Sequence, residues 1–388
     1  MVEHIFRGSK RYWLWLGFLA AVIAAGFAAY IYQFQNGLTV TNMGRDVSWG
    51  LYIGQFTFFV GVAASAVMVV LPYYLHNAKE FGKVTIFGEF LAISAVIMCL
   101  LFIIVDLGRP DRLFNVIIMA TPHSMMFWDM VVLSGYLLIN LLVGWNVLEA
   151  EYNSVSPATW VKRLAYLSIP WAVSIHTVTA FLISGLPGRH YWLTAIMAAR
   201  FLASAFASGP SLLILLMLFL KKFTSFKVED KVLNKLSVII TYALTISLFF
   251  IGLEFFTAFY SQVPTHMHTL QYLFVGLEGH TALVPFMAVF TVLALVAWVL
   301  LLNPKTRKNQ KYLGMACAFV FVAMMIEKGL ALIIGGFIPN TFERITEYLP
   351  SLIELMVTVG VWAIGALVLT ILYKMAVAVK ERAGETEH

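Results

Sequence analysis

The sequence predicts an all-α polytopic membrane protein. Of its 388 residues, 61% are hydrophobic and 12% are charged, whereas a soluble domain carries about 25% charged residues. Apolar runs of about 18 residues or more recur along the whole chain, and each is long enough to cross the hydrocarbon core of a bilayer. These observations indicate a membrane protein rather than a soluble one.

Ten apolar runs have the length of a membrane span. The first is too long for a cleavable signal peptide, and no A-x-A-like site follows it. The two cysteines, Cys99 and Cys317, both lie inside apolar runs, which excludes Cys-ligated iron–sulfur clusters or zinc within this chain. The expected spans are 12–34, 50–75, 86–105, 125–147, 164–186, 203–220, 236–260, 281–302, 313–337 and 351–373.

Lysine and arginine predict the orientation. Of the 26 basic residues, 19 fall on the side of the two termini, six on the opposite side, and Lys328 within a span. Because positive loops stay in the cytoplasm, we expect a cytoplasmic (inner) membrane protein with both termini cytoplasmic. The net charge of +6 follows from this distribution and does not imply nucleic acid. The six outer residues are Arg45, Arg109, Arg112, Arg189, Arg200 and Arg344.

A weak internal similarity bears on how the spans are grouped. The segment FFVGVAASAV (58–67) resembles FLASAFASGP (201–210), and both are rich in the small residues that let helices approach closely in lipid. Ordinary packing faces and a true repeat both explain the similarity. A repeat predicts an N-terminal helix and outer loop (1–48), a first four-helix bundle with the outer-side site (49–190), a second four-helix bundle (191–338), and a last helix with a cytoplasmic tail (339–388).

Polar side chains follow one face of the predicted second span. Ser48, Tyr52 and Gln55 have i, i+4, i+7 spacing, which places a hydroxyl, a phenol and an amide on one side of a helix. Asp106 lies at the same outer level, where the sequence GRP ends the third span, and Asp129 opens the fourth span. Helix capping is the alternative interpretation of both carboxylates.

Together these groups predict a pocket at the outer side of the membrane. Its phenol, amide, carboxylate and imidazole groups suit an amphipathic ligand with a polar ring and a lipid tail. A quinol fits best, because its oxidation needs proton acceptors poised near neutral pH. Arg109 is expected to pair with Asp106 and keep it ionised. We expect Asp106 and His123 to be catalytic, and the binding candidates are Trp49, Tyr52, Gln55, Arg109, Trp128 and Asp129, although the tryptophans also suit an interfacial belt.

Further ionisable residues lie deeper in the spans. His176 is the one histidine near the middle of a span, so a haem held by two buried histidines is not expected. Any redox chemistry must then act on a diffusible cofactor. Structural ion pairing and proton conduction both explain buried charges, and Lys328 is expected to pair with Glu254 or Glu354. The proton-path candidates are Glu89, His176, Glu254 and Glu327.

Three motifs resemble a known family. WGLYIGQFTFFVGVAASA, then LGRP after the third span, then HYWLTAIMAARFLASAFASG follow the order found in NrfD/polysulfide-reductase-type (PsrC) membrane subunits. The resemblance runs from about residue 47 to at least 209 and is greatest to the menaquinol-interacting subunits of the Dsr and Hmc complexes of sulfate reducers. Where some of these relatives have a histidine in the second span, this chain reads VAAS at 62–65.

The resemblance implies a haem-free quinone subunit of a respiratory electron-transfer complex. Its expected partners are an extracytoplasmic ferredoxin-like iron–sulfur subunit and further subunits of a membrane redox complex, which can include cytochromes. The outer site of the family would map onto Trp49, Tyr52, Gln55, Asp106, Arg109 and His123.

Two other functions remain open from the sequence. A secondary transporter also has intramembrane charges and repeated halves, but it predicts matching helix breaks near the midplane, and Pro170 and the Gly209–Pro210 pair have no clear counterparts. A structural anchor for a redox enzyme would explain the spans and leave the outer polar residues without a role.

Overall fold

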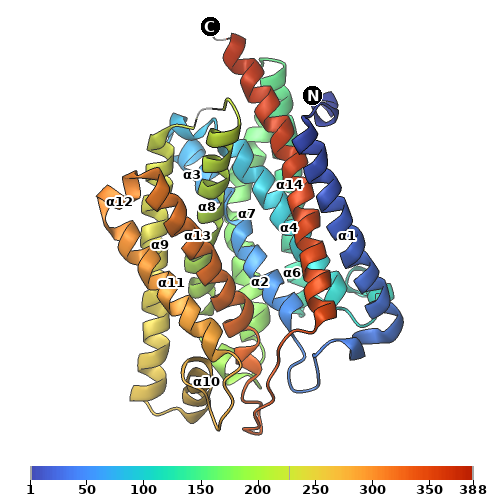
Figure 1. Ribbon diagram of the computed structural model, residues 1–388, viewed down its shortest axis with the longest axis vertical. Coiled ribbons are helices and arrows are strands. Elements are labelled where there is room, and N and C mark those ends of the chain that lie inside the picture. Colours follow the sequence, from blue (N-terminus) through green and yellow to red (C-terminus); the bar gives the residue numbers. More distant parts are fainter. Residues whose placement is uncertain (1, 227, 387–388) are drawn as a thin grey trace.

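Ten helical segments of membrane-spanning length run between the two ends of the molecule, in the number and order that the sequence predicts (Figure 1). The computed structural model describes residues 2–226 and 228–386, and in these two ranges there are helices but no strand. The all-α prediction is therefore confirmed. The spans are α1 (Lys10–Asn36), α2 with α3 (Leu51–Ala63 and Val67–Leu75), α4 (Thr85–Asp106), α6 (Met125–Tyr152), α7 (Thr159–Ser184), α8 (Met197–Phe223), α9 (Asp230–Tyr260), α11 (Val284–Leu302), α13 with η6 (Gln310–Met325 and Ile326–Leu332) and α14 (Leu352–Thr386).

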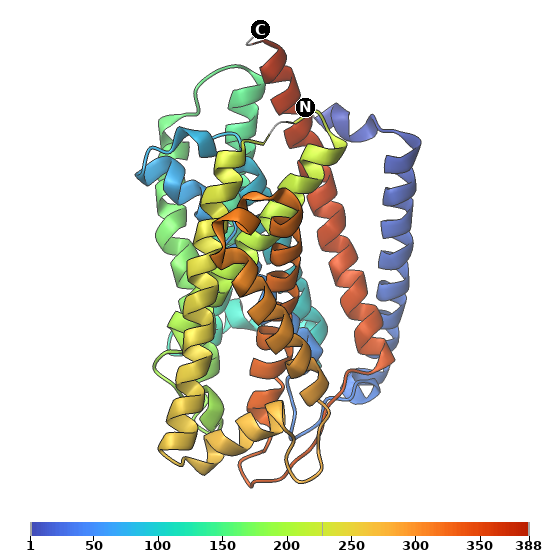
Figure 2. The same cartoon turned by 60° about the vertical axis from the view of Figure 1, so that its left-hand side comes forward.

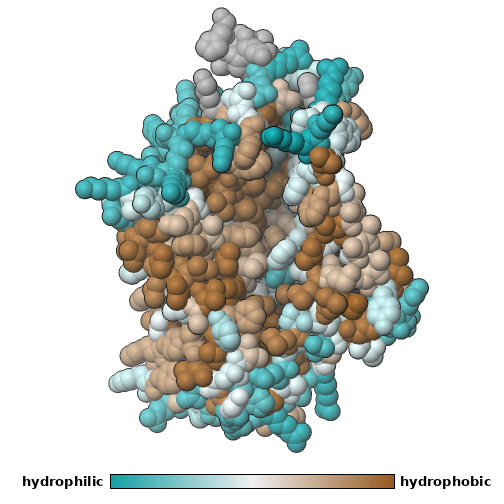
Figure 3. All heavy atoms as spheres, in the orientation of Figure 1, coloured by the Kyte–Doolittle hydropathy of each residue, from teal (hydrophilic) through white to brown (hydrophobic). Residues whose placement is uncertain are grey.

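Short helices occupy the connections between the spans. Both chain ends lie at one end of the molecule, and α10 lies at the other (Figures 1 and 2). The charge distribution predicts that the α10 end faces outward, and it is called the outer end below. An apolar band separates hydrophilic groups at the two ends, as a membrane-embedded protein requires (Figure 3). The short elements are η1 (Val2–Phe6), η2 (Gly37–Val40), η3 (Lys79–Phe81), η4 (Pro110–Arg112), α5 (Asn115–Ile118), η5 (His190–Trp192), α10 (Pro264–Phe274), α12 (Pro304–Lys308) and η7 (Gly335–Phe337).

Helix α2 lies at the centre of the bundle, where small residues allow close approach. A Cβ atom added to Gly54 would lie 1.9 Å from the carbonyl oxygen of Gly329 in η6. The two similar small-residue segments also face each other, since Gly61 lies against Ala205 of α8, and a Cβ atom on Gly209 would lie 2.9 Å from the backbone nitrogen of Ser65. The segments therefore form a helix–helix contact, as small residues do in lipid.

Two spans are irregular, and neither irregularity was predicted. The second span is interrupted at residues 64–66, between α2 and α3, and the ninth ends in the π-helical segment η6. In contrast, α7 continues through Pro170 and α8 through Pro210. The prolines singled out in the sequence therefore do not break their helices.

The first and last spans pack against each other on one side of the bundle (Figure 2). They cross where Gly26 meets Gly360, and a Cβ atom on Gly26 would lie 2.6 Å from the Cα atom of Gly360. Only 17% of the apolar window of the first span is buried, against 72% for the second and third spans. Most of the α1 surface is therefore available to lipid or to another subunit.

Ion pairs tie connections together at the opposite, inner end. Glu80 of η3 bonds to Lys235 and lies 3.6 Å from the ammonium of Lys231, both in α9. The hydrogen bond from Lys235 lowers the pKa of Glu80 to about 2. Lys380 of α14 donates a 2.6 Å hydrogen bond to Glu151 of α6. These contacts link η3 to α9 and α14 to α6 at the inner end of the bundle, where most of the lysines lie.

Candidate functional site

Three helices meet through polar side chains at the outer end of the bundle. Tyr52, in the first turn of α2, is fully buried and donates a 2.6 Å hydrogen bond to the side-chain oxygen of Gln33 in α1. Gln33 donates through Nε2 to the backbone oxygen of Val105 in α4, at 2.7 Å. The carbonyl groups of the last helical turn have no partner within their helix. Gln33 therefore satisfies one of them directly before Asp106.

Two buried oxygen atoms beside this contact have no partner. They are Oε1 of Gln55, one turn further along α2, and Oδ1 of Asp106, the last residue of α4, and neither accepts a hydrogen bond from any residue that the structure describes. Since buried polar atoms are almost always paired, each of these two unpaired acceptors is a candidate contact for a ligand that donates hydrogen bonds.

The other candidates of the 106–128 segment are solvent-exposed. Arg109 forms a two-pronged pair with Asp111, at 3.0 Å to each oxygen, so the expected pairing of Arg109 with Asp106 is wrong. His123 is exposed. Trp128 is 42% exposed and donates a 2.8 Å hydrogen bond to the carbonyl of Pro122. Tyr52 and Gln55 are buried and Asp106 is partly buried, whereas Arg109, His123 and Trp128 are exposed.

Asp129 does not cap its helix. It lies in α6 five residues after Ser124, which occupies the capping position, and only 4% of it is exposed. Its Oδ1 accepts a 2.6 Å hydrogen bond from the hydroxyl of Thr179 in α7. The capping interpretation is wrong because α6 begins at Met125, so Asp129 lies beyond the first turn and in the interface between α6 and α7.

Trp49 belongs to an aromatic cluster rather than to an interfacial belt. Its ring stacks on Trp192 at a centroid distance of 5.8 Å and meets the edge of Phe337. Arg189 lies 4.2 Å above the Phe337 ring. A small polar cavity adjoins this cluster, between η5, α10 and residues 336–343, and neither Tyr52, Gln55 nor Asp106 lines it. The cavity is lined by residues from three connections at the outer end, between 188 and 343.

A carboxylate of α14 completes the outer end. Glu354 is fully buried and accepts hydrogen bonds from the backbone nitrogens of Asn42 and Ser351, at 2.9 and 2.8 Å, and from the hydroxyl of Tyr348. Tyr348 in turn accepts a 2.9 Å hydrogen bond from the backbone nitrogen of Leu51. Sequence reasoning named Glu354 but missed Tyr348 and Gln33. The signals available were the S-x-x-E capping pattern at 351–354 and a glutamine near the end of an apolar run.

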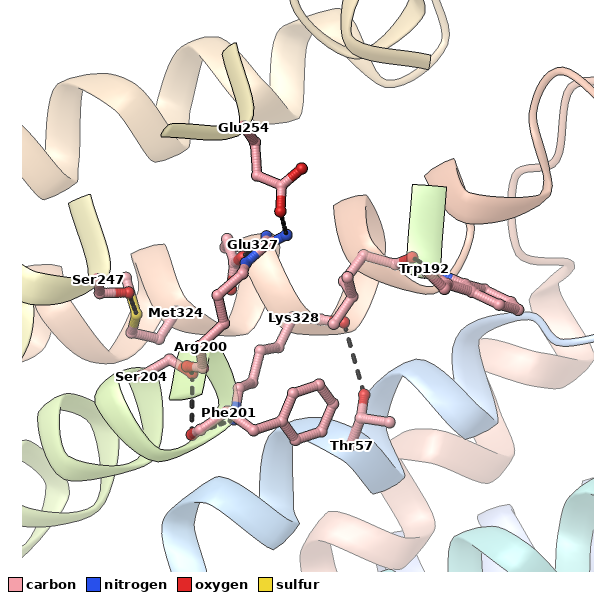
Figure 4. Close-up of polar contacts among 11 residues, drawn as sticks. Thr57, Trp192, Arg200, Phe201, Ser204, Ser247, Glu254, Met324, Glu327 and Lys328 are labelled. Carbon is pink, nitrogen blue, oxygen red and sulfur yellow. Dashed lines mark hydrogen bonds and ion pairs between the residues drawn. The ribbon is translucent and has the colours of Figure 1, made fainter. Parts of the chain in front are cut away.

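A separate cluster of buried charges joins α8, α9 and η6 (Figure 4). The guanidinium of Arg200 lies 3.5 Å from Glu254 and 2.9 Å from Glu327. Arg200 is thus an intramembrane residue of α8, and its placement in an outer connection was wrong because α8 begins earlier than expected. The expected partners of Lys328 were also wrong. Its ammonium donates a 3.1 Å hydrogen bond to the carbonyl of Phe201 and lies 4.4 Å above the ring of that residue.

Two deep ionisable residues stand outside this cluster. Glu89, near the inner end of α4, has an Oε2 atom without a partner in the described ranges, and 3% of the residue is exposed. His176, in the middle of α7, is fully buried, and neither ring nitrogen has a hydrogen-bond partner among the residues described. Both groups could bind water or exchange a proton.

The family comparison bears on the functions left open by the sequence. The model of the polysulphide reductase NrfD family matches residues 39–340. The chain belongs to the NrfD family. It is therefore a multi-pass membrane subunit of an oxidoreductase complex, and the secondary-transporter alternative is not supported.

Three relatives match almost the whole chain. A membrane subunit of a dimethyl sulfoxide reductase, so named in Halobacterium salinarum, is 25% identical over 91% of this chain and 88% of its own. A selenate reductase subunit of Mesobacillus selenatarsenatis is 23% identical over 93% and 92%. The Hdr-like menaquinol oxidoreductase integral membrane subunit of Archaeoglobus fulgidus is 24% identical over 97% and 96%. The narrower likeness to Dsr and Hmc subunits stays a prediction.

Proposed function

We propose that this chain is the quinone-reactive membrane subunit of its complex and that it oxidises or reduces a menaquinol at the outer end of α2 and α4. The observation that carries the proposal is the pair of unpaired buried acceptors, Oε1 of Gln55 and Oδ1 of Asp106. A quinol ring has two hydroxyl donors, which would satisfy two such acceptors. The name of the Archaeoglobus relative supports menaquinol as the ligand class.

Asp106 is the proposed proton acceptor. Oxidation of a quinol releases two protons and two electrons, and a carboxylate within hydrogen-bond reach of the ring hydroxyl can take a proton. Gln55 would hold the second hydroxyl, and the buried phenol of Tyr52 would border the ring. His123 lies exposed on the connection that follows Asp106 and would pass protons on to the outer solution. Arg109 and Trp128 would line the exposed entrance, and Trp49 the aromatic wall.

An iron–sulfur subunit is the proposed electron partner. The three relatives are named as subunits of multi-subunit reductases or oxidoreductases, so the chain is expected to work with partners. The proposed quinone site lies at the outer end, so the electrons would leave to a cluster docked on that face, within a membrane complex that can also include cytochromes.

Proton conduction through the bundle is a second part of the proposal, and it concerns Glu89 and His176. Both are buried with unpaired atoms, which favours exchange with water or protons over a fixed ion pair. Glu254 and Glu327 are instead held by Arg200, which favours a structural role for both.

The quinone content of the purified protein tests the proposed function. Quinone would be extracted from the unmodified protein, from Gln55→Leu and from Gln35→Leu, which alters an exposed glutamine of α1. We expect menaquinone in the unmodified protein and in Gln35→Leu, and severalfold less in Gln55→Leu. Equal quinone content in all three would remove Gln55 from the site, and absence of quinone even after incubation with a short-chain menaquinone would overturn the proposal.

A further inference from the structure

The first and last spans lie outside the part of the chain that the family model covers. The match runs from residue 39 to 340, whereas α1 ends at Asn36 and α14 begins at Leu352. These two helices pack on each other through the close crossing of Gly26 and Gly360. Each nevertheless places one buried polar side chain at the outer end of the bundle, which a helix serving only as a membrane anchor does not require.

Helix α1 reaches the site through Gln33. The described buried residues of this helix are Leu19, Gly26, Ala29 and Gln33, which form one stripe. Gln33 is the one amide in that stripe, and both ends of its side chain are used. Its oxygen accepts from Tyr52 in α2, and its nitrogen donates to the Val105 carbonyl in the last turn of α4. Gln33 therefore fixes the distance between the helix that carries Tyr52 and the helix end that carries Asp106.

Helix α14 reaches the same place through Glu354. Ser351 and Glu354 bond to each other's backbone nitrogens, as in a capping box that begins a helix. The same carboxylate also accepts from Tyr348, whose oxygen accepts from the Leu51 nitrogen. This nitrogen is one of the first-turn donors of α2 that have no partner within the helix. Glu354 therefore anchors the start of α2 as well as the start of α14.

We propose that α1 and α14 form an accessory pair that completes the outer quinone site, with Gln33 and Tyr348–Glu354 as its positioning residues. Gln33 holds the end of α4 before Asp106, and Tyr348 with Glu354 holds the first turn of α2 before Tyr52 and Gln55. The inference rests on the proposed function, because it is the binding of a quinone by these residues that the pair supports.

Removing either contact leaves buried polar groups without partners. Gln33→Leu introduces an apolar side chain of similar size and leaves the Tyr52 hydroxyl and the Val105 carbonyl without hydrogen-bond partners. Tyr348→Phe leaves the Leu51 nitrogen and one oxygen of Glu354 unpaired. A buried polar group without a hydrogen-bond partner is energetically costly. The first turn of α2 and the last turn of α4 would therefore move to restore hydrogen bonds, and their relative position would change.

The affinity for a short-chain menaquinone tests this inference. The full-length protein would be titrated in detergent, and quenching of tryptophan fluorescence would give both the dissociation constant and the number of binding sites per chain. Two pairs of variants would be compared with the unmodified protein. The first pair is Gln33→Leu and Gln35→Leu, which changes an exposed glutamine of the same helix. The second pair is Tyr348→Phe and Tyr272→Phe, which removes a buried hydroxyl that has no partner among the described residues.

We expect Gln33→Leu and Tyr348→Phe to raise the dissociation constant on the order of tenfold, the effect of about 1.4 kcal/mol, with the number of sites unchanged. Gln35→Leu and Tyr272→Phe should keep the unmodified affinity. A merely structural role would lower the number of sites per chain and leave the affinity of the remaining sites unchanged, and that result would overturn the inference. Unmodified affinity in Gln33→Leu and Tyr348→Phe would also overturn it. Failure of the unmodified protein to bind menaquinone would instead overturn the proposed function together with this inference.

Discussion

The phenol of Tyr52 donates a 2.6 Å hydrogen bond to Gln33, a residue 19 positions earlier in a different membrane span. The same glutamine bonds to the carbonyl of Val105. A single amide thus joins α1, α2 and α4 at the level where Asp106 ends its helix. The relationship explains why a peripheral span with little buried surface carries a buried glutamine, and it lies beside Asp106, the subject of the last prediction below.

The buried cluster around Arg200 is predicted to stabilise the fold. Arg200→Leu leaves the carboxylates of Glu254 and Glu327 in the membrane interior without their cation. Breaking a buried pair in this way typically costs about 3–5 kcal/mol, so thermal unfolding in detergent should occur at a clearly lower temperature. Arg112→Leu, at an exposed position, is the matched control and should unfold like the unmodified protein.

A combined variant distinguishes the effect of uncompensated charge from the effect of altered packing at the same cluster. Adding Glu254→Gln and Glu327→Gln to Arg200→Leu removes the uncompensated charges, and most of the lost stability should return. If the combined variant is no more stable than Arg200→Leu alone, the ion pairs do not explain the stability of this region.

The close approach of α2 and η6 predicts a second effect on stability. In Gly54→Ala the new methyl group would lie 1.9 Å from the Gly329 carbonyl oxygen, so the two segments must separate. Overpacking of this kind costs about 1–3 kcal/mol or more. Gly252→Ala in α9, where the methyl group meets nothing within 4 Å, is the control and should be neutral or slightly stabilising. Equal unfolding temperatures for the two variants would show that α2 and η6 are not in contact.

Much of the fold follows from the sequence because membrane spans are set by length and hydrophobicity. The number of spans and the all-α class depend only on these quantities. The start of α8 does not, since a helix can extend beyond its apolar run when a polar residue has a buried partner, as Arg200 has in Glu254 and Glu327. The role of Asp129 was also missed, because its bond to Thr179 depends on the packing of α6 against α7.

The candidate site could be predicted only in part. The spacing of Tyr52 and Gln55 on α2 and the position of Asp106 at the end of α4 are local features, and the structure has both. Gln33 and Tyr348 were missed because their roles depend on contacts between segments far apart in the chain. Arg109 was assigned to Asp106 by proximity in sequence, whereas Asp111, two residues away, offers a better-placed carboxylate in water.

The orientation of the chain is predicted to place both termini in the cytoplasm. Cysteines introduced at Asn115 and at Lys308, both exposed positions, should react with an impermeant thiol reagent from opposite sides of the membrane. Cys99 and Cys317 are buried and should give little background. Labelling of Lys308→Cys in intact cells would reverse the topology and place the proposed quinone site on the cytoplasmic side.

The most direct test of the proposed function is the rate at which Asp106→Asn oxidises quinol in the intact complex. The measurement follows menaquinol-dependent reduction of the iron–sulfur partner, with Asp111→Asn as the control because this carboxylate is exposed and only five residues away. Removal of a proton acceptor typically costs a factor of about 100 or more. We therefore predict that Asp106→Asn lowers kcat/KM by at least that order while the complex still assembles, and that Asp111→Asn keeps the unmodified rate. Oxidation of quinol by Asp106→Asn at the unmodified rate would contradict the account and place the proton acceptor elsewhere in the chain.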